Sequence, residues 1–209
     1  EAQILEHYRN QAKVAENHIV LDKQLRMQAD PITMDWIDSF TKKGQLKEIP
    51  HTVDGYQIKV FDDPEMLDLE IQKAKEKDSA LSRVLATYDW EYSQKRKPDD
   101  RLRAYWEVVI GKWHKPWNRE LAAELSRKEK RKISGLAWAE QPQTINEVGS
   151  TFTIQGFDLN YAGVILGPSV KYRNGKIIFA PSESHNNKAI RNRTLSDGTK
   201  QKFGEMLIQ

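Results

Sequence analysis

The sequence predicts an α/β fold, with helices packed on both faces of a mostly parallel sheet. Three observations lead to this prediction. Strand-like and helix-like segments alternate over residues 1–87, a strongly apolar strand follows at residues 162–166, and the composition is globular. Of the 209 residues, 38% are hydrophobic and 30% are charged, which suits one domain with a well-solvated surface. We therefore interpret residues 1–209 as a single domain.

The chain opens with a predicted helix and a predicted strand. Residues 1–17 carry apolar side chains near helical spacing, and residues 18–25 contain the short apolar run of a strand. Asp30 followed by Pro31 combines a capping residue with proline at the first helical position, which predicts the start of a helix. Gly44 ends that helix.

A second round of the same pattern follows. Residues 56–61 alternate apolar and polar side chains, as a half-exposed strand does. Asp63-Pro64 predicts the start of another helix, and residues 82–87 predict a buried strand. The order strand, helix, strand, helix, strand is typical of a parallel sheet.

Residues 88–140 are less regular and are predicted to form an insertion on the main fold. They contain one candidate strand, residues 106–110, and one candidate helix, residues 118–130. Large aromatic side chains require burial, so we expect the segment to be ordered around its tryptophans. These are Trp106, Trp113, Trp117 and Trp138.

The last third is clearly patterned. Residues 148–154 lead to a turn at Gln155-Gly156, and residues 162–166 predict a buried strand. A hairpin is predicted with strands at residues 170–172 and 176–179 around the turn Arg173-Asn174-Gly175. A final helix, residues 200–208, is still running where the sequence stops, so we expect a longer parent protein.

Composition and motif searches exclude several functions. Cysteine is absent, which excludes disulfides and thiolate metal sites. No apolar run approaches bilayer length and no signal peptide is recognisable, so a cytoplasmic protein without a membrane partner is expected. The sequence lacks GxxxxGK[ST], GxSxG and HExxH, and its five histidines are scattered singly. We therefore expect no metal site and no self-contained active site.

The net charge of +3 permits nucleic-acid binding, and the distribution of the basic residues is more informative. Aromatic residues lie between two basic runs, an arrangement used by single-strand binding grooves. The alternative is that both runs are solvated faces. The first run is Lys95-Arg96-Lys97 with Arg101 and Arg103, the second is Arg127-Lys128 with Lys130-Arg131-Lys132, and the aromatics are Tyr105, Trp106, Trp113 and Trp117.

Residues 149–168 carry the main chemical pattern, a hydroxyl-rich loop, the Gln155-Gly156 turn, Asp158, and then the apolar strand. A glycine lets backbone approach a ligand closely, and hydroxyls with main-chain amides can hold a phosphate. A nearby carboxylate can accept a hydrogen bond from a ribose hydroxyl. The alternative is an ordinary turn before a core strand.

This stretch resembles motif V of superfamily 1 helicases. Its longer form, QGFDLNYAGVILGP, is similar to a bacterial domain-of-unknown-function family with Schlafen group 3-like DNA/RNA helicase domains. Leu25-Arg26, in the context LDKQLRMQADPITMDWIDSF, resembles motif IV of that family, and the ATYDWEY and PWN segments are similar too. The resemblance covers essentially the whole chain. It implies the second RecA-like (P-loop NTPase-like) motor domain of a helicase.

The resemblance also implies residue roles. Arg26 reaches the γ-phosphate of ATP bound on a separate P-loop domain, because a guanidinium suits the charge developing in phosphoryl transfer. Gln155, Gly156 and Asp158 line the nucleotide side, with Asp158 accepting a hydrogen bond from the ribose. The nucleic-acid backbone is contacted by Ser150, Thr151 and Thr153. The alternatives are a surface ion pair for Arg26 and loop or helix capping for the others.

Two departures from the family pattern limit what is implied. Relatives often carry histidine where this chain has Phe152, so a contact by that imidazole is lost or replaced by stacking. The arginine-bearing motif VI is not found in the 209 residues. Without it and the P-loop, the chain is not expected to hydrolyse ATP alone.

The implied cofactors are ATP and Mg²⁺ in the parent protein, with none bound tightly by this chain. The implied partners are the P-loop domain of the same protein and single-stranded DNA or RNA. A non-motor nucleic-acid-binding module and a protein-interaction module are the alternatives.

Overall fold

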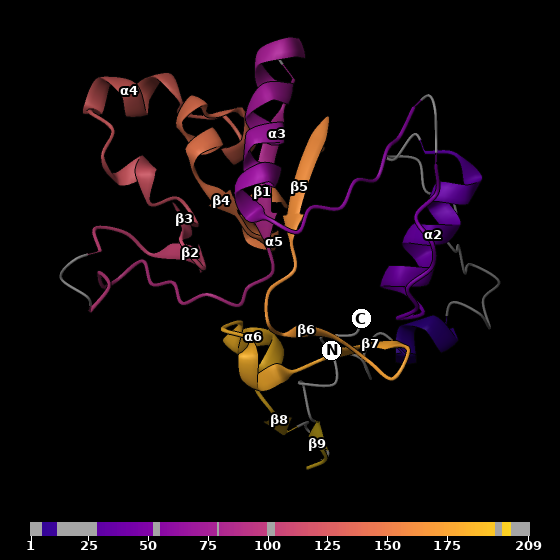
Figure 1. Cartoon of the computed structure of the whole chain (residues 1–209). Coiled ribbons are helices and arrows are strands. Elements are labelled where there is room, and N and C mark those ends of the chain that lie inside the picture. Colours follow the sequence, from indigo (N-terminus) through magenta and orange to yellow (C-terminus); the bar gives the residue numbers. More distant parts are fainter. Residues whose placement is uncertain are drawn as a thin grey trace.

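A three-stranded parallel sheet forms the centre of the molecule (Figure 1). The computed structural model describes residues 6–11, 29–51, 55–78, 80–99, 103–194 and 198–201. The strand order is β4-β1-β5, so Val84 of β1 lies between Val148 of β4 and Gly163 of β5. The strands are β1 (Ser82–Ala86), β4 (Val148–Gly149) and β5 (Tyr161–Ile165). The predicted α/β class and the predicted strands near 82–87 and 162–166 are confirmed.

Helix α3 (Pro64–Asp78) covers one face of the sheet. Side chains alternate between the two faces of a strand, and Gly163 lies on the face that α3 covers. A Cβ atom at Gly163 would stand 2.6 Å from Leu67 Cδ2 and 2.9 Å from Ile71 Cγ1. The missing side chain therefore allows the helix to approach the sheet closely.

Short helices cover the opposite face. A Cβ atom at Gly149 would stand 2.6 Å from the Trp138 ring and 2.8 Å from Leu85 Cδ2, so packing is as close on this side. The prediction of helices on both faces is confirmed, with single turns replacing long helices here. These elements are η2 (Trp138–Glu140), η3 (Pro142–Asn146) and α5 (Thr151–Ile154).

The irregular segment 88–140 contributes to the same core. Strands β2 (Glu107–Ile110) and β3 (Trp113–Pro116) form a hairpin, and Trp117 then forms a parallel bridge with Val148 of β4. The expected burial is confirmed for Trp106, Trp117 and Trp138, whose exposed fractions are 7%, 0% and 3%. Trp113 is half-buried.

A fully buried carboxylate ties this segment to the sheet. Glu147 immediately precedes β4 and has an exposed fraction of 0%. One carboxylate oxygen accepts a hydrogen bond from the Leu121 amide (2.6 Å) and the other from Trp138 Nε1 (3.1 Å). Burial raises the pKa of Glu147, and the two hydrogen bonds oppose that shift. Glu147 thereby joins η1 (Leu121–Ala123) and η2 to the start of β4.

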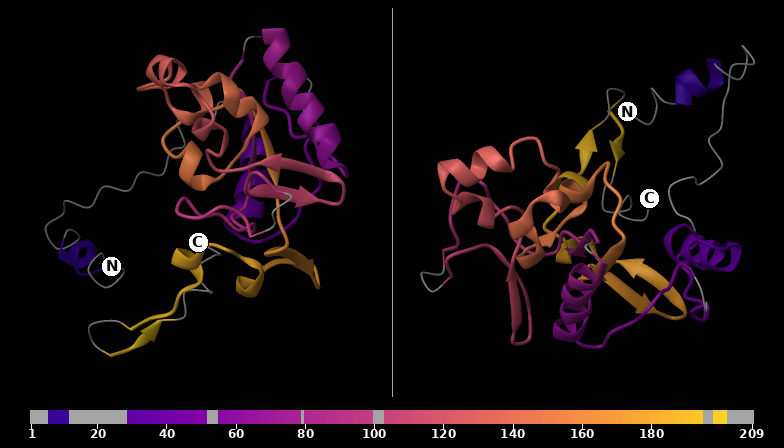
Figure 2. Two further views of the ribbon diagram at one scale, coloured as in Figure 1. Left: turned by 90° about the vertical axis from the view of Figure 1, so that its left-hand side faces the viewer. Right: turned by 90° about the horizontal axis from the view of Figure 1, so that it is seen from above.

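The remaining elements surround this centre (Figure 2). The Ile177 amide donates to the Gly44 carbonyl (2.9 Å), which links the predicted hairpin to the end of the first predicted Asp-Pro helix. Both predictions are confirmed, as α2 (Pro31–Thr41) and as β6 (Val170–Arg173) with β7 (Lys176–Phe179). The other elements are α4 (Arg127–Lys132), η4 (Pro181–Glu183), α6 (Asn187–Ile190), β8 (Arg193–Thr194) and β9 (Lys200–Gln201).

Two predictions at the flanks of the fold are wrong. Residues 56–61 form no helix or strand and pair with no strand in the described ranges, and Val60 is 68% exposed, so the alternation there does not reflect a sheet face. Lys200–Gln201 form a strand paired with β8 instead of starting a helix. The rest of that predicted helix lies outside the described residues.

The predicted helix over residues 118–130 is also wrong at its start. Asn118 and Arg119 have φ values of 60° and 72°, which a right-handed helix does not allow. The α-helix begins only at Arg127, after Ser126 forms a capping box with Glu129. Residues 6–11 are helical, within the helix predicted for residues 1–17. The strand predicted for residues 18–25 lies outside the described residues, as does Arg26.

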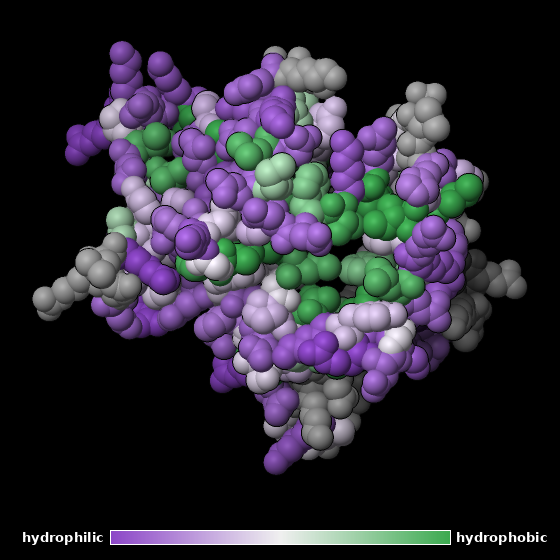
Figure 3. Space-filling view, in the orientation of Figure 1, coloured by the Kyte–Doolittle hydropathy of each residue, from purple (hydrophilic) through white to green (hydrophobic). Residues whose placement is uncertain are grey.

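Strand β5 is the last strand in the order β4-β1-β5, and one of its two faces is exposed. In the part of the chain that is described, its outer edge pairs with no strand. Val164 is 53% exposed and Leu166, just beyond the strand, is 49% exposed. Hydrophobic side chains gather in the middle of the face seen in Figure 3, around the position of β5. No described helix is both long and apolar enough to cross a membrane.

The contact between α3 and β5 predicts a difference between two neighbouring substitutions. Gly163→Val should lower the free energy of unfolding by about 1–3 kcal/mol, because the new side chain collides with Leu67 and Ile71. Ala162→Val, on the exposed face of the same strand, is the matched control and should change it by less than about 0.5 kcal/mol. Urea unfolding measures both, and equal effects would contradict the close packing of α3.

Glu147 predicts a substitution effect that depends on pH. Glu147→Leu should cost about 1–3 kcal/mol at neutral pH, because it leaves the Leu121 amide and Trp138 Nε1 without an acceptor. The pKa of Glu147 is raised in the fold, so protonation favours the folded state. That contribution is present below the unfolded pKa and is lost as pH rises through the folded pKa.

The stability difference between the parental protein and Glu147→Leu, which does not titrate at this position, should therefore widen as the pH falls from about 8 to about 5. Urea unfolding of both proteins across this range measures it. A difference that stays constant with pH would show that Glu147 does not titrate differently in the folded and unfolded states.

Candidate functional site

Four segments leave the sheet at one edge, which we call the carboxyl edge. The three strands are parallel, so their carboxyl ends meet there. Trp117 forms a parallel bridge with Val148, which places the next residue, Asn118, at the same edge. Ligands of open α/β sheets bind at this edge. Helix α5 lies at this end of the strands (Figure 1). The four segments are residues 87–89, 118–119, 150–153 and 167–169.

Of the three residues predicted to contact a nucleic-acid backbone, two form the cap of helix α5 and one is exposed. Ser150 is fully buried, its hydroxyl accepting from the Phe152 amide (3.3 Å) and donating to Asn118 Oδ1 (2.6 Å). The Thr153 hydroxyl accepts from the Ser150 amide (2.8 Å). Both residues therefore cap α5, while Thr151 is exposed. Thr151 is the accessible hydroxyl of the set.

An exposed aromatic ring lies beside Thr151. Phe152 is 50% exposed, and its ring meets Tyr88 edge to face with 5.4 Å between centroids. Tyr88 in turn packs on the buried Trp117 ring at 5.0 Å, and burial raises the pKa of Tyr88. The rings below hold Phe152 at the surface, where its free face can stack on a planar ligand.

The residues predicted to face a nucleotide lie along the chain between the two edges of the sheet. Gly156 has a φ of 81° with no atom within 4 Å of a Cβ position, and Gln155 and Asp158 are exposed. Two residues after Asp158, the Asn160 amide donates to the Leu81 carbonyl (2.9 Å) at the opposite edge. Asp158 thus lies away from Ser150. Since Arg26 lies outside the described residues, its contact with the γ-phosphate stays a prediction.

Sequence reasoning missed the residues that fasten the carboxyl edge. Asp89 Oδ2 accepts from the Ser169 amide (2.8 Å), and the Thr87 hydroxyl accepts from the Gly167 amide (2.8 Å). A Cβ atom at Gly167 would stand 2.5 Å from Asp89 Oδ2, so glycine is needed there. In the sequence, the signal for this role was the carboxylate of Asp89, which lies two residues beyond the predicted strand at residues 82–87.

Two of the four aromatic residues in the proposed groove of interleaved basic and aromatic residues are buried instead. Trp106 and Trp117 belong to the core and cannot stack on a base. Arg96 is engaged by the carboxylates of Glu91 and Asp99, and its guanidinium lies 5.6 Å from the Trp106 ring. Helix α4 differs, since all of its residues are exposed, five of them cationic.

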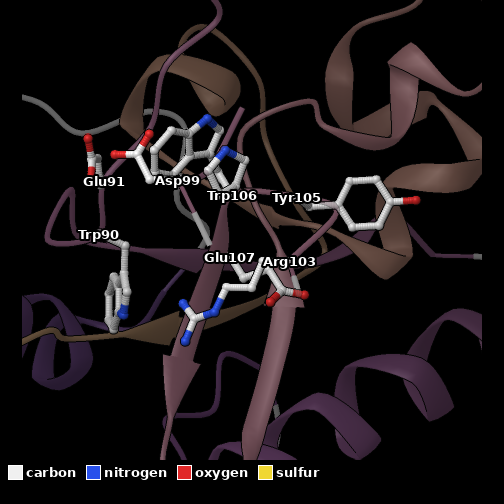
Figure 4. Close-up of a pocket in the computed structure, with 8 residues that line it drawn as sticks. Trp90, Glu91, Asp99, Arg103, Tyr105, Trp106 and Glu107 are labelled. Atoms are coloured by element: carbon white, nitrogen blue, oxygen red, sulfur yellow. The ribbon is translucent and has the colours of Figure 1, made fainter. Parts of the chain in front are cut away.

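An open pocket lies beside this aromatic cluster (Figure 4). Its lining carries three carboxylates and one guanidinium, so its charge does not suit a phosphate backbone. The lining includes Trp90, Glu91, Asp99, Arg103, Trp106 and Glu107. In the described ranges, no group of three or more histidine, aspartate or glutamate side chains is arranged to hold a metal ion.

One comparison with known proteins names a family. A family model described as "Schlafen group 3, DNA/RNA helicase domain" matches residues 1–209. Uncharacterized protein YPL245W of Saccharomyces cerevisiae is 31% identical over 164 residues, covering 73% of this chain and 32% of the yeast protein. The chain thus spans about a third of the length of that relative, and the similarity extends to a eukaryote. No solved structure matches.

The capping arrangement of α5 predicts different effects for two adjacent hydroxyls. Ser150→Ala should lower the free energy of unfolding by about 1–3 kcal/mol, because it removes the helix cap and leaves Asn118 Oδ1 without its donor. Thr151→Ala, the exposed neighbour, should change it by less than about 0.5 kcal/mol. Thermal denaturation measures both. A Ser150→Ala protein as stable as the parent would show that the cap contributes nothing.

Proposed function

The chain belongs to the Schlafen group 3 DNA/RNA helicase domain family, and we propose that it is the second, RecA-like motor domain of a superfamily 1-type ATPase. In this role it completes an ATP site between two domains and contacts the backbone of single-stranded DNA or RNA. The observation that carries the proposal is the carboxyl edge of a parallel sheet, where Thr151 and Phe152 are exposed side by side.

The exposed pair suits a single strand. Stacking on an aromatic ring tolerates any base, because every base has a π face. Phe152 offers such a ring, supported from below by Tyr88. The Thr151 hydroxyl is free to donate to a phosphate oxygen, and such contacts fix the position of a strand without reading its sequence. Many relatives carry histidine at the position of Phe152. Here, base stacking on the phenylalanine ring would replace a contact by the imidazole.

The nucleotide side of the proposal uses other residues. Gly156 has open space where a side chain would stand, and exposed Asp158 can accept a hydrogen bond from a ribose hydroxyl. Gln155 lies next to that glycine, and Arg26 would donate to the γ-phosphate. ATP with Mg²⁺, bound on the P-loop domain of the same protein, supplies the phosphoryl group. The described residues thus leave room for a nucleotide without enclosing it.

Opening and closing of two motor domains around a nucleotide is a hinge motion of a general kind. The nucleic-acid residues lie at the carboxyl edge, whereas Asp158 lies toward the opposite edge, near Asn160. Closure on the nucleotide would therefore move the edge that holds the strand. Movement along a nucleic-acid strand requires such coupling between the nucleotide-binding residues and the residues that hold the nucleic acid.

A non-motor nucleic-acid-binding module is the second candidate, and α4 favours it. Its five exposed cations and single carboxylate, already used in a capping box, give a strongly positive surface. Such a surface attracts phosphates whatever the role of ATP. The two candidates differ in one respect, because only the motor requires ATP hydrolysis to depend on Arg26.

The arginine assignment is tested in a preparation that combines this domain with the P-loop domain of the same protein. Single-strand-stimulated phosphate release should appear, and Arg26→Ala should reduce it by about a thousandfold or more, as loss of a transition-state arginine does. Oligonucleotide binding without nucleotide should be unchanged. Arg173→Ala, at an exposed arginine that ends β6, is the control and should retain activity. Undiminished hydrolysis by Arg26→Ala would overturn the assignment.

A further inference from the structure

Two consecutive residues at the carboxyl edge adopt a strained backbone conformation. Asn118 and Arg119 have φ values of 60° and 72°, in the left-handed region that residues other than glycine seldom occupy. Asparagine is tolerated there, but arginine is not favoured. Strain of this kind persists only where the surroundings enforce it, and it collects at functional sites. The pair therefore raises the question of what Arg119 does.

The residues on both sides of Arg119 are anchored in the interior. Asn118 is 5% exposed, its amide donates to the Val148 carbonyl (3.1 Å), and its Oδ1 accepts from the Ser150 hydroxyl (2.6 Å). Glu120 is 7% exposed, and its carboxylate accepts from the Trp106 amide (3.3 Å). Both neighbours are fixed inward, whereas Arg119 itself is exposed.

Arg119 is available for a ligand. Among the described residues, no carboxylate lies within 4 Å of its guanidinium, in contrast to Arg96, which is held by two. The charge of Arg119 acts at longer range on Glu147 and Tyr92, where it opposes the rise in pKa that burial causes. Its neighbour Asn118 bonds directly to Ser150, the cap of α5, and Thr151 and Phe152 follow at once in the chain. One edge of the sheet thus presents a guanidinium, a hydroxyl and an aromatic ring.

We infer that Arg119 contacts the sugar-phosphate backbone of the single strand and that Asn118 positions it. The inference rests on the proposed function. It adds a contact residue that lies outside residues 149–168, the segment with the main sequence motif. The planar guanidinium can donate two parallel hydrogen bonds to one phosphate, while the base of the same strand stacks on Phe152. The bond between Asn118 and Ser150 fixes the cation relative to α5.

The test compares substitutions at Arg119 in the full-length protein. Arg119→Ala removes the charge, Arg119→Lys keeps it, and Arg119→Gly removes it while relieving the backbone strain. Arg173→Ala is the control for loss of an exposed arginine. Fluorescence anisotropy with labelled dT20 and rU20 across a range of salt concentrations gives the affinity and its salt dependence. Urea unfolding gives the stability of each variant.

Arg119→Ala should weaken binding roughly tenfold, and the slope of log K against log salt should become shallower by about 0.7, the value for one phosphate of a single strand. Arg119→Lys should keep the slope. Arg119→Gly should bind as weakly as Arg119→Ala yet unfold at a higher urea concentration than the parent, which a purely structural arginine would not do.

Three results would overturn the inference. Parental affinity and slope in both neutral variants would remove Arg119 from the interface and leave the proposed function standing. Equal weakening by Arg173→Ala would reduce the effect to net charge. A parental protein that binds neither oligonucleotide would overturn the inference and the proposed function together.

Discussion

The fold depends on a carboxylate that is buried away from water. Glu147 receives hydrogen bonds from the Leu121 amide and from the Trp138 indole, and it directly precedes β4. Burying a charge costs free energy unless its hydrogen bonds are satisfied, so both donors must be in place when β4 forms. The irregular segment 88–140 and the sheet are therefore ordered together. The capping residue Ser150 follows three positions later, so its place is set by the same contact.

The carboxyl edge acquires its chemistry from parallel pairing. Segments far apart in the chain end at the same place because their strands run in the same direction. Hydroxyls that motif comparison assigns to a ligand are divided by this geometry, with Ser150 and Thr153 directed inward and Thr151 outward. Buried hydroxyls of this kind hold the exposed residues in position. Residues that stabilise α5 and residues that are exposed to a ligand therefore lie side by side within residues 150–153.

Sequence patterns predicted the elements that local chemistry determines. The Asp-Pro helix starts, the turn around Asn174 and the apolar strand β5 all follow from capping, positive φ and hydrophobic runs. The failures arose where tertiary packing decides. Residues 56–61 alternate without a strand to pair with, and residues 118–119 read as helical although contacts with Val148 and Ser150 force them into the left-handed region. Trp106 and Trp117 fitted both core burial and a binding groove, because their position between two basic runs does not distinguish a core ring from an exposed one.

Among the described residues, one edge of the sheet is occupied and the other is not. Trp117 occupies the outer side of β4, so an additional strand could join only beside β5. There the main-chain amides and carbonyls lie next to exposed Val164, which makes β5 a template for any extended segment that meets it. Lateral growth of this domain is consequently one-directional. A segment that paired with β5 would also remove this exposed edge, which is a site of aggregation in unprotected sheets.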